Sequence, residues 1–380
     1  VVLENDAPQS DVQAVKNLSL DGVYAKSEAH RYYPQGNFAS QLVGFLGGDG
    51  NGQYGLEGYY NDLLEGKNGI VSSGSNLTDL NGSDLSLTID YNIQFEAEAL
   101  LKEAESEKGI DSGQIIVMDP NTGEVLALAN YPSFDPNNYS SVKDFSTFQD
   151  AAVQKLFEPG SIFKPFTMAM ALNEGKVSPN QSFYDSGSVS IGPNTVYNFD
   201  HEKYGKTNMS GILEKSINVG AVFLGQQVSH QTFLSYVDKF GLDKKSGVDL
   251  QGEVAAEHPL QNAADFDFAT AAFGQGIAMT PLQLAVGMCA IANGGRVPKP
   301  YVVAKITHGD EEQDTKPQLS SPIITAATAS EVTEMMVNVV NRGFGSNARI
   351  NHYYIAGKTG TAQIPYPDKA GYYPDRTIQS

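Results

Sequence analysis

Tryptophan is missing from this 380-residue sequence, and cysteine occurs once, as Cys289. A single cysteine excludes a disulfide within the chain and a zinc site built from several thiolates. Because Cys289 lies in an apolar run, we expect it to be a small buried side chain. The zinc-hydrolase spacing H-E-x-x-H is absent as well, since His201-Glu202 is not followed by the second histidine. We therefore expect no bound metal.

Positive charge and long apolar runs are also scarce. The 25 lysine and arginine residues face 44 aspartate and glutamate residues, which gives a net charge of −19. Such a surface repels phosphate backbones and argues against nucleic acid as a partner, although halophilic adaptation produces the same excess. No run of about eighteen apolar residues occurs, so the sequence predicts no membrane-spanning segment. Because the chain begins at Val1 and not at methionine, an N-terminal anchor or signal could precede it.

Residues 1–85 are rich in glycine, asparagine, tyrosine and aspartate, and we expect them to form a separate N-terminal module. Gly50, Gly52 and Gly55 match the G-x-G-x-x-G spacing of dinucleotide-binding loops. Such a site also needs a βαβ unit with an acidic residue about 20 positions on, and a loop-like stretch follows here instead. Asp49 would in addition repel the phosphates. We therefore expect a structural glycine loop and no cofactor.

Residues 86–380 carry the patterns of a larger domain that mixes helices and strands. Alternation predicts a strand over 84–90, and two apolar runs around a Pro-Asn-Thr-Gly turn predict a hairpin over 112–129. The other elements are predicted as helices at 92–108, 268–293 and 326–342 and as a strand-like run at 353–364. Strands at both ends with helices between them indicate an α+β domain, in which one antiparallel sheet closes late in the sequence beside a helical cluster.

The segment Glu158-Pro159-Gly160-Ser161 interrupts the chain just before an apolar helix, which should end near residues 173–175. Ser161 falls on the first helical turn, and Lys164 follows three positions on, on the same face. First-turn amides favour negative charge, and a lysine held between apolar walls loses solvation and becomes neutral. This spacing suits a nucleophilic serine with lysine as its base.

Two further motifs complete a pattern. Ser216-Ile217-Asn218 falls in a helical region where a break would expose both polar side chains. Lys358-Thr359-Gly360 falls in the last strand-like run, where glycine lets a substrate backbone approach. The combination S-x-x-K, S-x-N and K-T-G is the signature of penicillin-binding proteins and class A β-lactamases.

The same spellings recur elsewhere in the chain. The second set consists of Ser140-Ser141-Val142-Lys143, Ser178-Pro179-Asn180 and Lys245-Ser246-Gly247. Each of these lies in a turn-rich segment that lacks the apolar helix or strand of its counterpart. We therefore assign the site to the set that contains Ser161, Ser216 and Lys358.

The three assigned segments suit acyl transfer. Ser161 would attack a carbonyl carbon while Lys164 takes the serine proton. The developing oxyanion needs two fixed donors, for which we expect the amides of Ser161 and Thr361. Ser216 and Lys358 can pass a proton towards the leaving amine.

Two other side chains suit substrate binding. Asn218 can hold a substrate amide through its side-chain amide group. Lys358 and Thr359 offer a cation and a hydroxyl that match a terminal carboxylate.

The motifs resemble those of class B penicillin-binding proteins, the monofunctional D,D-transpeptidases that cross-link peptidoglycan, and the similarity covers nearly the whole chain. Arg31-Tyr32-Tyr33-Pro34 and residues 52–64 resemble the head or pedestal module of that family. Residues 112–129 resemble the opening hairpin of its transpeptidase domain, and residues 270–295 resemble a late helical segment. Lys358-Thr359-Gly360-Thr361-Ala362-Gln363 is more similar to the division-type branch than to the elongation type.

The resemblance implies a serine β-lactamase-like fold over residues 86–380 and a pedestal, or dimerisation-type, module over residues 1–85. It assigns the family's active-site roles to Ser161, Lys164, Ser216, Asn218, Lys358, Thr359 and Gly360. The implied partners are stem peptides ending in D-Ala-D-Ala, β-lactams that acylate the serine, a membrane-bound glycosyltransferase and divisome proteins. The implied location is the outer face of the cytoplasmic membrane, with the single-pass anchor outside this chain.

Some questions stay open at this level. Family members continue past the position of Ser380 with a strand beside the K-T-G strand and a terminal helix, and we expect both to be missing here. A serine β-lactamase and an acylable β-lactam sensor or scaffold are the alternatives to a transpeptidase. A β-lactamase needs a base for its hydrolytic water. The E-x-x-x-N spelling at Glu334 and Asn338 lies in a predicted amphipathic helix, where a solvated face is the simpler explanation.

Overall fold

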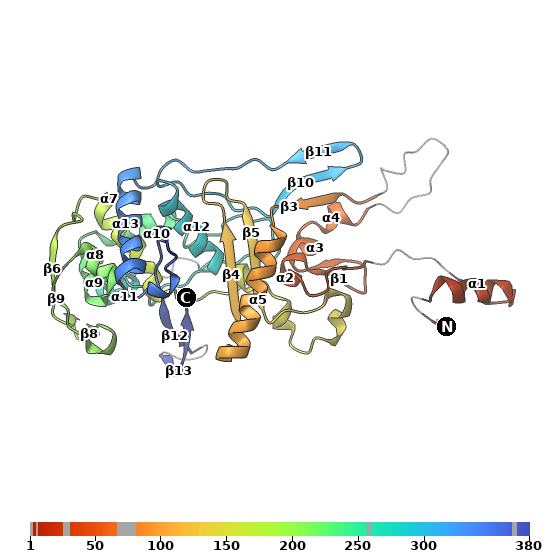
Figure 1. The fold of residues 1–380 in the computed structure, drawn as a ribbon, viewed down its shortest axis with the longest axis horizontal. Coiled ribbons are helices and arrows are strands. Elements are labelled where there is room, and N and C mark those ends of the chain that lie inside the picture. Colours follow the sequence, from red (N-terminus) through yellow and green to blue (C-terminus); the bar gives the residue numbers. More distant parts are fainter. Residues whose placement is uncertain (1–2, 5–6, 26–30, 67–80, 257–259, 367–370) are drawn as a thin grey trace. The chain divides into compact units, whose positions relative to one another are not determined.

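The computed structural model describes residues 3–4, 7–25, 31–66, 81–256, 260–366 and 371–380 (Figure 1). The chain divides into two compact units, residues 1–35 and 36–380. In the first unit, helix α1 spans Gln9–Asn17 and buries none of its side chains. The division into modules at residue 85 stays a prediction. Among the described residues, none of the helices has the length and hydropathy that a bilayer crossing requires.

The second unit begins with a segment of short elements between residues 36 and 66. They are α2 (Ser40–Val43), β1 (Phe45–Leu46), β2 (Gly52–Gln53), α3 (Gly55–Tyr59) and α4 (Asn61–Leu64). Gly55 has a φ of +44°, and a Cβ at this position would overlap the carbonyl oxygen of Leu42. Glycine is therefore required there for close chain packing.

Asp249 anchors this segment to the rest of the unit. Its carboxylate accepts hydrogen bonds from the hydroxyl of Tyr60 (3.0 Å) and from the amides of Val302 (2.7 Å) and Val303 (2.8 Å). Leu56 also joins an apolar cluster that contains Val303. The Asp249 carboxylate and this apolar cluster thus attach residues 36–66 to later parts of the chain.

The predicted hairpin is present, and a helix packs across it. Strands β4 (Gly113–Met118) and β5 (Val125–Tyr131) pair in antiparallel register. Helix α5 (Tyr91–Lys108) places Leu101 in an apolar cluster with Ala129 of β5. These elements confirm the hairpin and the helix expected over 92–108.

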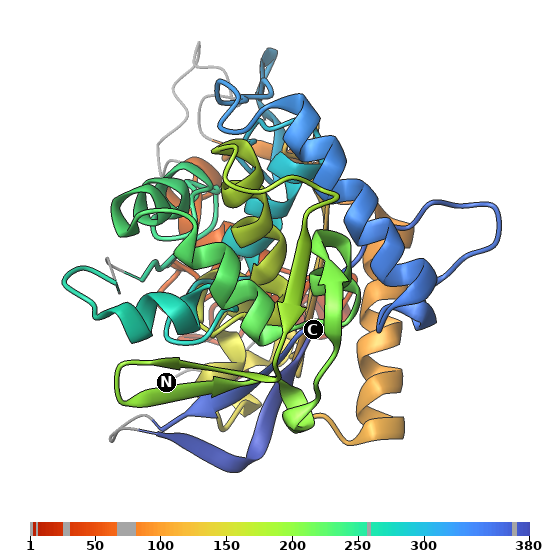
Figure 2. The same cartoon turned by 90° about the vertical axis from the view of Figure 1, so that its left-hand side faces the viewer.

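A cluster of helices forms the main apolar core (Figure 2). Its members are α7 (Lys164–Asn173), α8 (Met209–Glu214), α9 (Asn218–Gln226), α10 (His230–Lys239), α11 (Asp265–Ala271), α12 (Pro281–Ala292) and α13 (Ala326–Arg342). In α7, every residue from Lys164 to Leu172 is buried. The helix predicted over 326–342 is confirmed. The helical stretch predicted over 268–293 is divided into α11 and α12, because Gly274 and Gly276 adopt φ values of +83° and +71° between them.

Shorter helical pieces connect these elements. They are α6 (Ala151–Gln154) and the 3-10 turns η2 (Pro136–Ser141), η3 (Phe145–Phe148), η4 (Gly160–Phe163), η5 (Phe199–His201) and η6 (Ser346–Ala348).

The mixed helix-and-sheet fold class is confirmed, and all the strand pairs of the described residues are antiparallel, although they form separate small ladders and not the one sheet expected. One ladder has the order β11 (Glu311–Asp314), β10 (Val303–His308) and β3 (Asp84–Leu87). The others are β1–β2, β4–β5, β6 (Ser182–Asp185) with β9 (Gly205–Asn208), β7 (Ser188–Ile191) with β8 (Asn194–Tyr197), and β12 (Thr361–Pro365) with β13 (Tyr372–Gln379). Alternating apolar residues predict a strand, but they do not predict which other strand it pairs with.

Two expectations at the end of the chain are corrected. The strand beside the K-T-G segment is present, because β13 pairs antiparallel with β12. Lys358 and Thr359 do not lie on a strand, since β12 begins at Thr361. Backbone pairing with the last strand reaches Gly360, which exchanges two hydrogen bonds with Ser380, and the amide of Gly357 donates instead to the carbonyl oxygen of Met336 in α13 (3.3 Å).

Candidate active site

Ser161 lies in the 3-10 turn η4, which runs directly into α7. The amide of Lys164 donates to the carbonyl oxygen of Ser161, which is a three-residue 3-10 bond. Pro165 has no amide hydrogen with which to make the four-residue α-helical bond to the same carbonyl. The serine therefore precedes the regular helix, whereas the sequence suggested the first turn of a single helix.

Gly160 makes this turn possible. Its φ is +58°, and a Cβ there would lie 2.8 Å from the carbonyl oxygen of Thr361. Its amide donates to the carbonyl oxygen of Gly274 (2.9 Å). Only glycine fits this close approach, and the turn presents a partly exposed Ser161 beside Thr361.

Lys164 is fully buried, at 0% exposure, yet its Nζ has four polar neighbours. They are the Oγ of Ser161 (2.9 Å), the carbonyl oxygen of Ser216 (2.6 Å), the Oδ1 of Asn218 (2.7 Å) and the Oγ of Ser216 (3.2 Å). Burial, and secondly the charge of Lys358, lower the pKa of Lys164 well below its usual value. The direction of this shift agrees with the neutral lysine expected from the sequence.

These contacts fix where the lone pair of a neutral Lys164 points. The carbonyl oxygen of Ser216 and the Oδ1 of Asn218 can only accept, so each takes one N–H bond of the amine. The remaining tetrahedral position faces two hydroxyls, that of Ser161 at 2.9 Å and that of Ser216 at 3.2 Å, and the shorter distance favours Ser161. The orientation of Asn218 is set at its other end, where Nδ2 donates to the carbonyl oxygen of Tyr197 (3.1 Å).

Ser216 occupies the break between α8 and α9, as the sequence predicted, with a φ of +51°. This left-handed conformation is costly for serine and persists only where the surroundings impose it. Its hydroxyl lies 3.2 Å from the Nζ of Lys164 and 2.9 Å from the Nζ of Lys358. Ser216 thus bridges two lysines from distant parts of the chain.

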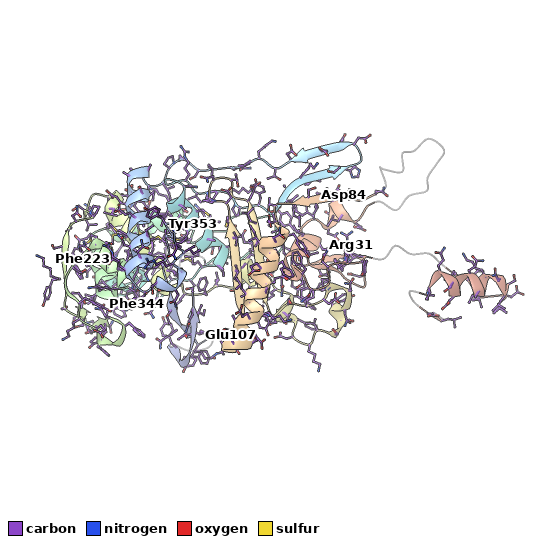
Figure 3. All side chains as sticks on the ribbon, in the orientation of Figure 1. Arg31, Asp84, Glu107, Phe223, Phe344 and Tyr353 are labelled. Atoms are coloured by element: carbon purple, nitrogen blue, oxygen red, sulfur yellow. The ribbon has the colours of Figure 1, made fainter. Side chains whose placement is uncertain are left out.

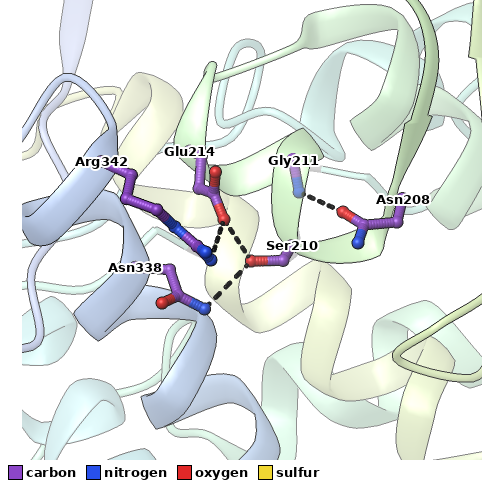
Figure 4. Close-up of polar contacts among 6 residues, drawn as sticks. All are labelled: Asn208, Ser210, Gly211, Glu214, Asn338 and Arg342. Atoms are coloured by element: carbon purple, nitrogen blue, oxygen red, sulfur yellow. Dashed lines mark hydrogen bonds and ion pairs between the residues drawn. The ribbon is translucent and has the colours of Figure 1, made fainter.

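Helix α13 holds the end of α8 that precedes Ser216 (Figure 4). The Oε1 of Glu214 accepts from the Oγ of Ser210 (2.6 Å) and from the Nη2 of Arg342 (3.0 Å). The amide of Phe344 donates to the carbonyl oxygen of Glu214 (3.3 Å). Since Glu214 lies two residues before Ser216, these contacts fix the backbone that carries the bridging hydroxyl.

Lys358 reaches the site from the segment that follows α13. Its Nζ donates to the Oγ of Ser216 (2.9 Å) and to the carbonyl oxygen of Thr359 (2.7 Å). Burial lowers the pKa of Lys358 to about 8. The side chain of Thr359 is exposed next to it, whereas Gly360 is buried. Earlier in the same segment, Phe344 and Tyr353 are exposed (Figure 3).

Thr361 turns its amide away from β13. Gly360 and Ser380 exchange two backbone hydrogen bonds, so the next pair, Thr361 with Gln379, is a non-hydrogen-bonded pair of the antiparallel ladder. The amide and carbonyl of Thr361 therefore point to the other edge of β12. That edge faces the Ser161 turn, because the carbonyl oxygen of Thr361 approaches Gly160.

The second set of motifs, at residues 140–143, 178–180 and 245–247, does not form a site. Ser140 is exposed at the end of η2, and Ser178 is exposed in a loop. The Oγ of Ser246 donates to the Oε1 of Glu253 (2.6 Å). The serine of Lys245-Ser246-Gly247 therefore has a structural role, which is to stabilise a loop.

Two contributors were not singled out from the sequence. The turn at Gly274 and Gly276 receives the amide of Gly160, and the carbonyl oxygen of Tyr197 orients Asn218. The glycine spacing at 274–276 was visible, but a short glycine pattern does not identify the segment that it contacts. A backbone carbonyl such as that of Tyr197 leaves no signal in the side-chain pattern.

The fold and the serine–lysine arrangement define the class of penicillin-recognising active-serine proteins. Comparisons with protein families agree, since residues 113–380 match the penicillin binding protein transpeptidase domain. Residues 1–79 match the penicillin-binding protein dimerisation domain. The chain belongs to the penicillin-binding protein family, in its class B.

Relatives of known name cover most of this chain. Stage V sporulation protein D of Bacillus subtilis is 34% identical over 367 residues, which cover 92% of this chain and 57% of that protein. The peptidoglycan D,D-transpeptidase FtsI of Escherichia coli K12 is 32% identical, over 93% of this chain and 60% of that protein. The chain therefore spans less than two thirds of the length of these relatives.

A solved structure gives the same fold. Penicillin binding protein 3 of Mycobacterium tuberculosis superposes with a TM-score of 0.85 and 32% identity, over 92% of this chain and 80% of that chain. The same protein has been crystallised in complex with aztreonam and with ampicillin.

Proposed function

We propose that this chain carries the catalytic site of a peptidoglycan D,D-transpeptidase whose substrates are stem peptides ending in D-Ala-D-Ala. The observation that supports it most is the environment of Lys164, whose buried amine has two carbonyl acceptors and, closer than the Ser216 hydroxyl, the hydroxyl of Ser161 at 2.9 Å. A neutral amine beside a hydroxyl is the arrangement that activates a serine nucleophile. The transpeptidase names of the relatives support the substrate class.

The acylation step would use the groups as follows. The Oγ of Ser161 attacks the carbonyl carbon of the penultimate D-alanine, and the serine proton moves to the Nζ of Lys164. Negative charge develops on the carbonyl oxygen, and the amides of Ser161 and Thr361 are the proposed donors to it. A donor of this kind typically lowers the barrier by about 3–4 kcal/mol.

Collapse of this intermediate breaks the carbon–nitrogen bond. The leaving amine of the terminal D-alanine needs a proton, and Ser216, in contact with Lys164 and Lys358, is placed to relay it. An ester on Ser161 remains. The amine of a second stem peptide then attacks this ester, loses a proton and restores the serine, so that one peptide bond has replaced another.

Substrate binding is assigned to Lys358, Thr359 and Asn218. The ammonium of Lys358 and the exposed hydroxyl of Thr359 suit the terminal carboxylate. Asn218 uses both ends of its amide, on Lys164 and on the carbonyl oxygen of Tyr197. We therefore assign it first to the orientation of Lys164, and contact with a substrate amide would require it to give up Tyr197.

A β-lactam presents a strained amide and a carboxylate, so it should acylate the same serine. Intact-mass analysis after incubation with benzylpenicillin should show one adduct, and peptide mapping should locate it on Ser161. Ser161→Ala should abolish the adduct, while Ser140→Ala, in the other S-x-x-K spelling, should leave it unchanged. An adduct on Ser140 would contradict the assignment.

We further propose that the complete protein acts at the outer face of the cytoplasmic membrane, beside a glycosyltransferase and proteins of the division machinery. The support is the division-type resemblance of the K-T-G segment together with the FtsI relatives. Cross-linking in cells, followed by identification of the captured proteins, tests these partners.

A further inference from the structure

A carboxylate beside the nucleophile has no role in the steps above. Glu158 precedes Ser161 by three residues and is 9% exposed. Its two oxygens accept from the hydroxyl of Tyr372 at 3.3 and 3.2 Å, and the amide of Gly276 faces its side chain. Burial raises the pKa of Glu158, and the Gly276 amide and the Tyr372 hydroxyl act in the opposite direction. A buried carboxylate is costly unless such donors compensate it.

The donors belong to two different walls of the site. Gly276 lies in the turn whose Gly274 carbonyl receives the amide of Gly160. Tyr372 is the first residue of β13 and pairs with Pro365, the last residue of β12, so it holds the end of the strand pair opposite to Thr361. Glu158 therefore joins the Ser161 turn to the glycine turn on one side and to the β12–β13 pair on the other.

The Ser161 turn and β12 also pack closely against each other, as the space around two glycines shows. A Cβ on Gly160 would lie 2.8 Å from the carbonyl oxygen of Thr361, and one on Gly360 would lie 3.0 Å from the side chain of Ile162. Within the described residues, no backbone hydrogen bond joins η4 to β12. Close packing without a backbone hydrogen bond leaves the separation of the two segments to side-chain contacts such as that of Glu158 with Tyr372.

We propose that Glu158 is a positioning residue: through Tyr372 and Gly276 it sets the separation between the Ser161 turn and β12. The amide of Ser161 belongs to the turn and the amide of Thr361 belongs to β12. By setting the distance between these two segments, Glu158 fixes the space in which an oxyanion binds. The inference rests on the proposed function, and the effect is confined to the chemical step. Oxyanion donors act only at about 2.7–3.1 Å, so a small widening lowers the rate of acylation.

The chain contains a matched control pair. At the far end of α7, the hydroxyl of Tyr236 donates to the Oε1 of Glu174 (2.7 Å), and Glu174 directly follows the helix. This tyrosine–glutamate pair does not touch β12 or the Ser161 turn; Glu174 is exposed, and the hydroxyl of Tyr236 also accepts from the Nδ2 of Asn173 (2.6 Å). Tyr236→Phe therefore removes at least as many hydrogen bonds as Tyr372→Phe without changing the oxyanion space.

The test is the kinetics of acylation by a fluorescent penicillin, with the limiting rate separated from the binding constant and the melting temperature measured in parallel. Glu158→Ala and Tyr372→Phe should each lower the limiting rate by about ten- to a hundredfold, with little change in binding. Glu158→Gln should recover most of the rate, because its carbonyl oxygen still accepts. The double variant Glu158→Ala/Tyr372→Phe should be no slower than Glu158→Ala, since both remove one connection. Tyr236→Phe should lower the melting temperature as Tyr372→Phe does and leave the limiting rate unchanged.

Three outcomes would overturn the positioning role. One is a normal limiting rate in folded Glu158→Ala and Tyr372→Phe. Another is an equal loss of rate in Tyr236→Phe, which would indicate general destabilisation. A third is normal formation but slower loss of the adduct in Glu158→Gln, which would make Glu158 a hydrolytic base. If the unaltered protein is not acylated at all, the proposed function fails instead, so the two failures are distinguishable.

Discussion

Lys164 and Lys358 meet at one hydroxyl group, that of Ser216, which lies 3.2 Å from the first Nζ and 2.9 Å from the second. Burial, and secondly repulsion by the charge of Lys358, lower the pKa of Lys164. Lys358 has a pKa of about 8 and is therefore mostly protonated at neutral pH. The direction of the Lys164 shift is the one that its role as a base requires.

Lys164→Arg should abolish the base while it keeps a positive charge. A guanidinium stays protonated near neutral pH, so it cannot accept the proton of Ser161. The rate of adduct formation with penicillin should fall by about 100-fold or more, and circular dichroism should show an unchanged fold. Lys143→Arg, in the other S-x-x-K spelling, should be neutral. A near-normal rate in Lys164→Arg would mean that another group, such as Lys358, is the base.

Binding of a carboxylate-bearing drug should weaken above pH 8. The pKa of Lys358 is lowered to about 8, so its ammonium is present below that pH and is lost above it. The dissociation constant for penicillin should therefore rise by about tenfold per pH unit beyond this point. Stopped-flow measurements from pH 6.5 to 9.5 follow this directly. Lys358→Arg should shift the loss to higher pH, and an identical profile in that variant would exclude Lys358 as the carboxylate partner.

The penicilloyl adduct on Ser161 should persist for many minutes once free drug is removed. Glu334 has the spelling of a hydrolytic base, but its side chain is exposed on α13. Without an activated water the ester waits for an amine, so Glu334→Ala should leave its lifetime unchanged. Decay of the adduct mass measures this. Turnover within seconds, slowed by Glu334→Ala, would favour a β-lactamase over a transpeptidase.

Asp150 should make stability depend on pH. It is 2% exposed, and its Oδ1 accepts from the Nδ2 of Asn130 (3.0 Å) and from the amide of Ala152 (3.0 Å). The Oδ2 of Asp150 and the Oδ1 of Asn130 have no hydrogen-bond partner among the described residues. If Asp150 is protonated on Oδ2, that hydroxyl can donate a hydrogen bond to the Oδ1 of Asn130, so both atoms gain a partner. Burial accordingly raises the pKa of Asp150 to about 6.

The sign of this effect follows from the raised pKa. Stabilisation by protonated Asp150 is complete below its unfolded pKa of about 4 and is lost as the pH rises through about 6. Asp150→Asn keeps the shape and the donor at every pH. It should therefore be up to about 3 kcal/mol more stable than the unaltered protein at pH 8, and similar to it near pH 4. Urea unfolding at the two pH values measures this, and an equal difference at both would contradict it.

The catalytic side chains were easier to predict from the sequence than the strand pairing that surrounds them. The spacing of Ser161 and Lys164, the break at Ser216 and the lowered pKa of Lys164 all follow from local patterns of helix, glycine and apolar residues. The pairing of β12 with β13 does not, because strand partners are chosen by long-range packing. For the same reason Lys358 was expected on a strand that in fact begins at Thr361. Roles that depend on a partner, such as that of Glu158, had no local signal at all.

The anchoring of residues 36–66 by Asp249 bears on how the protein can be dissected. Removing that segment would take Tyr60 from the carboxylate and Leu42 and Leu56 from the cluster that contains Val303. The apolar surface left behind would face water and favour self-association. A fragment for expression or crystallisation should therefore start near residue 36, where the compact unit begins. A fragment that starts at residue 86 would expose the apolar cluster around Val303 to solvent.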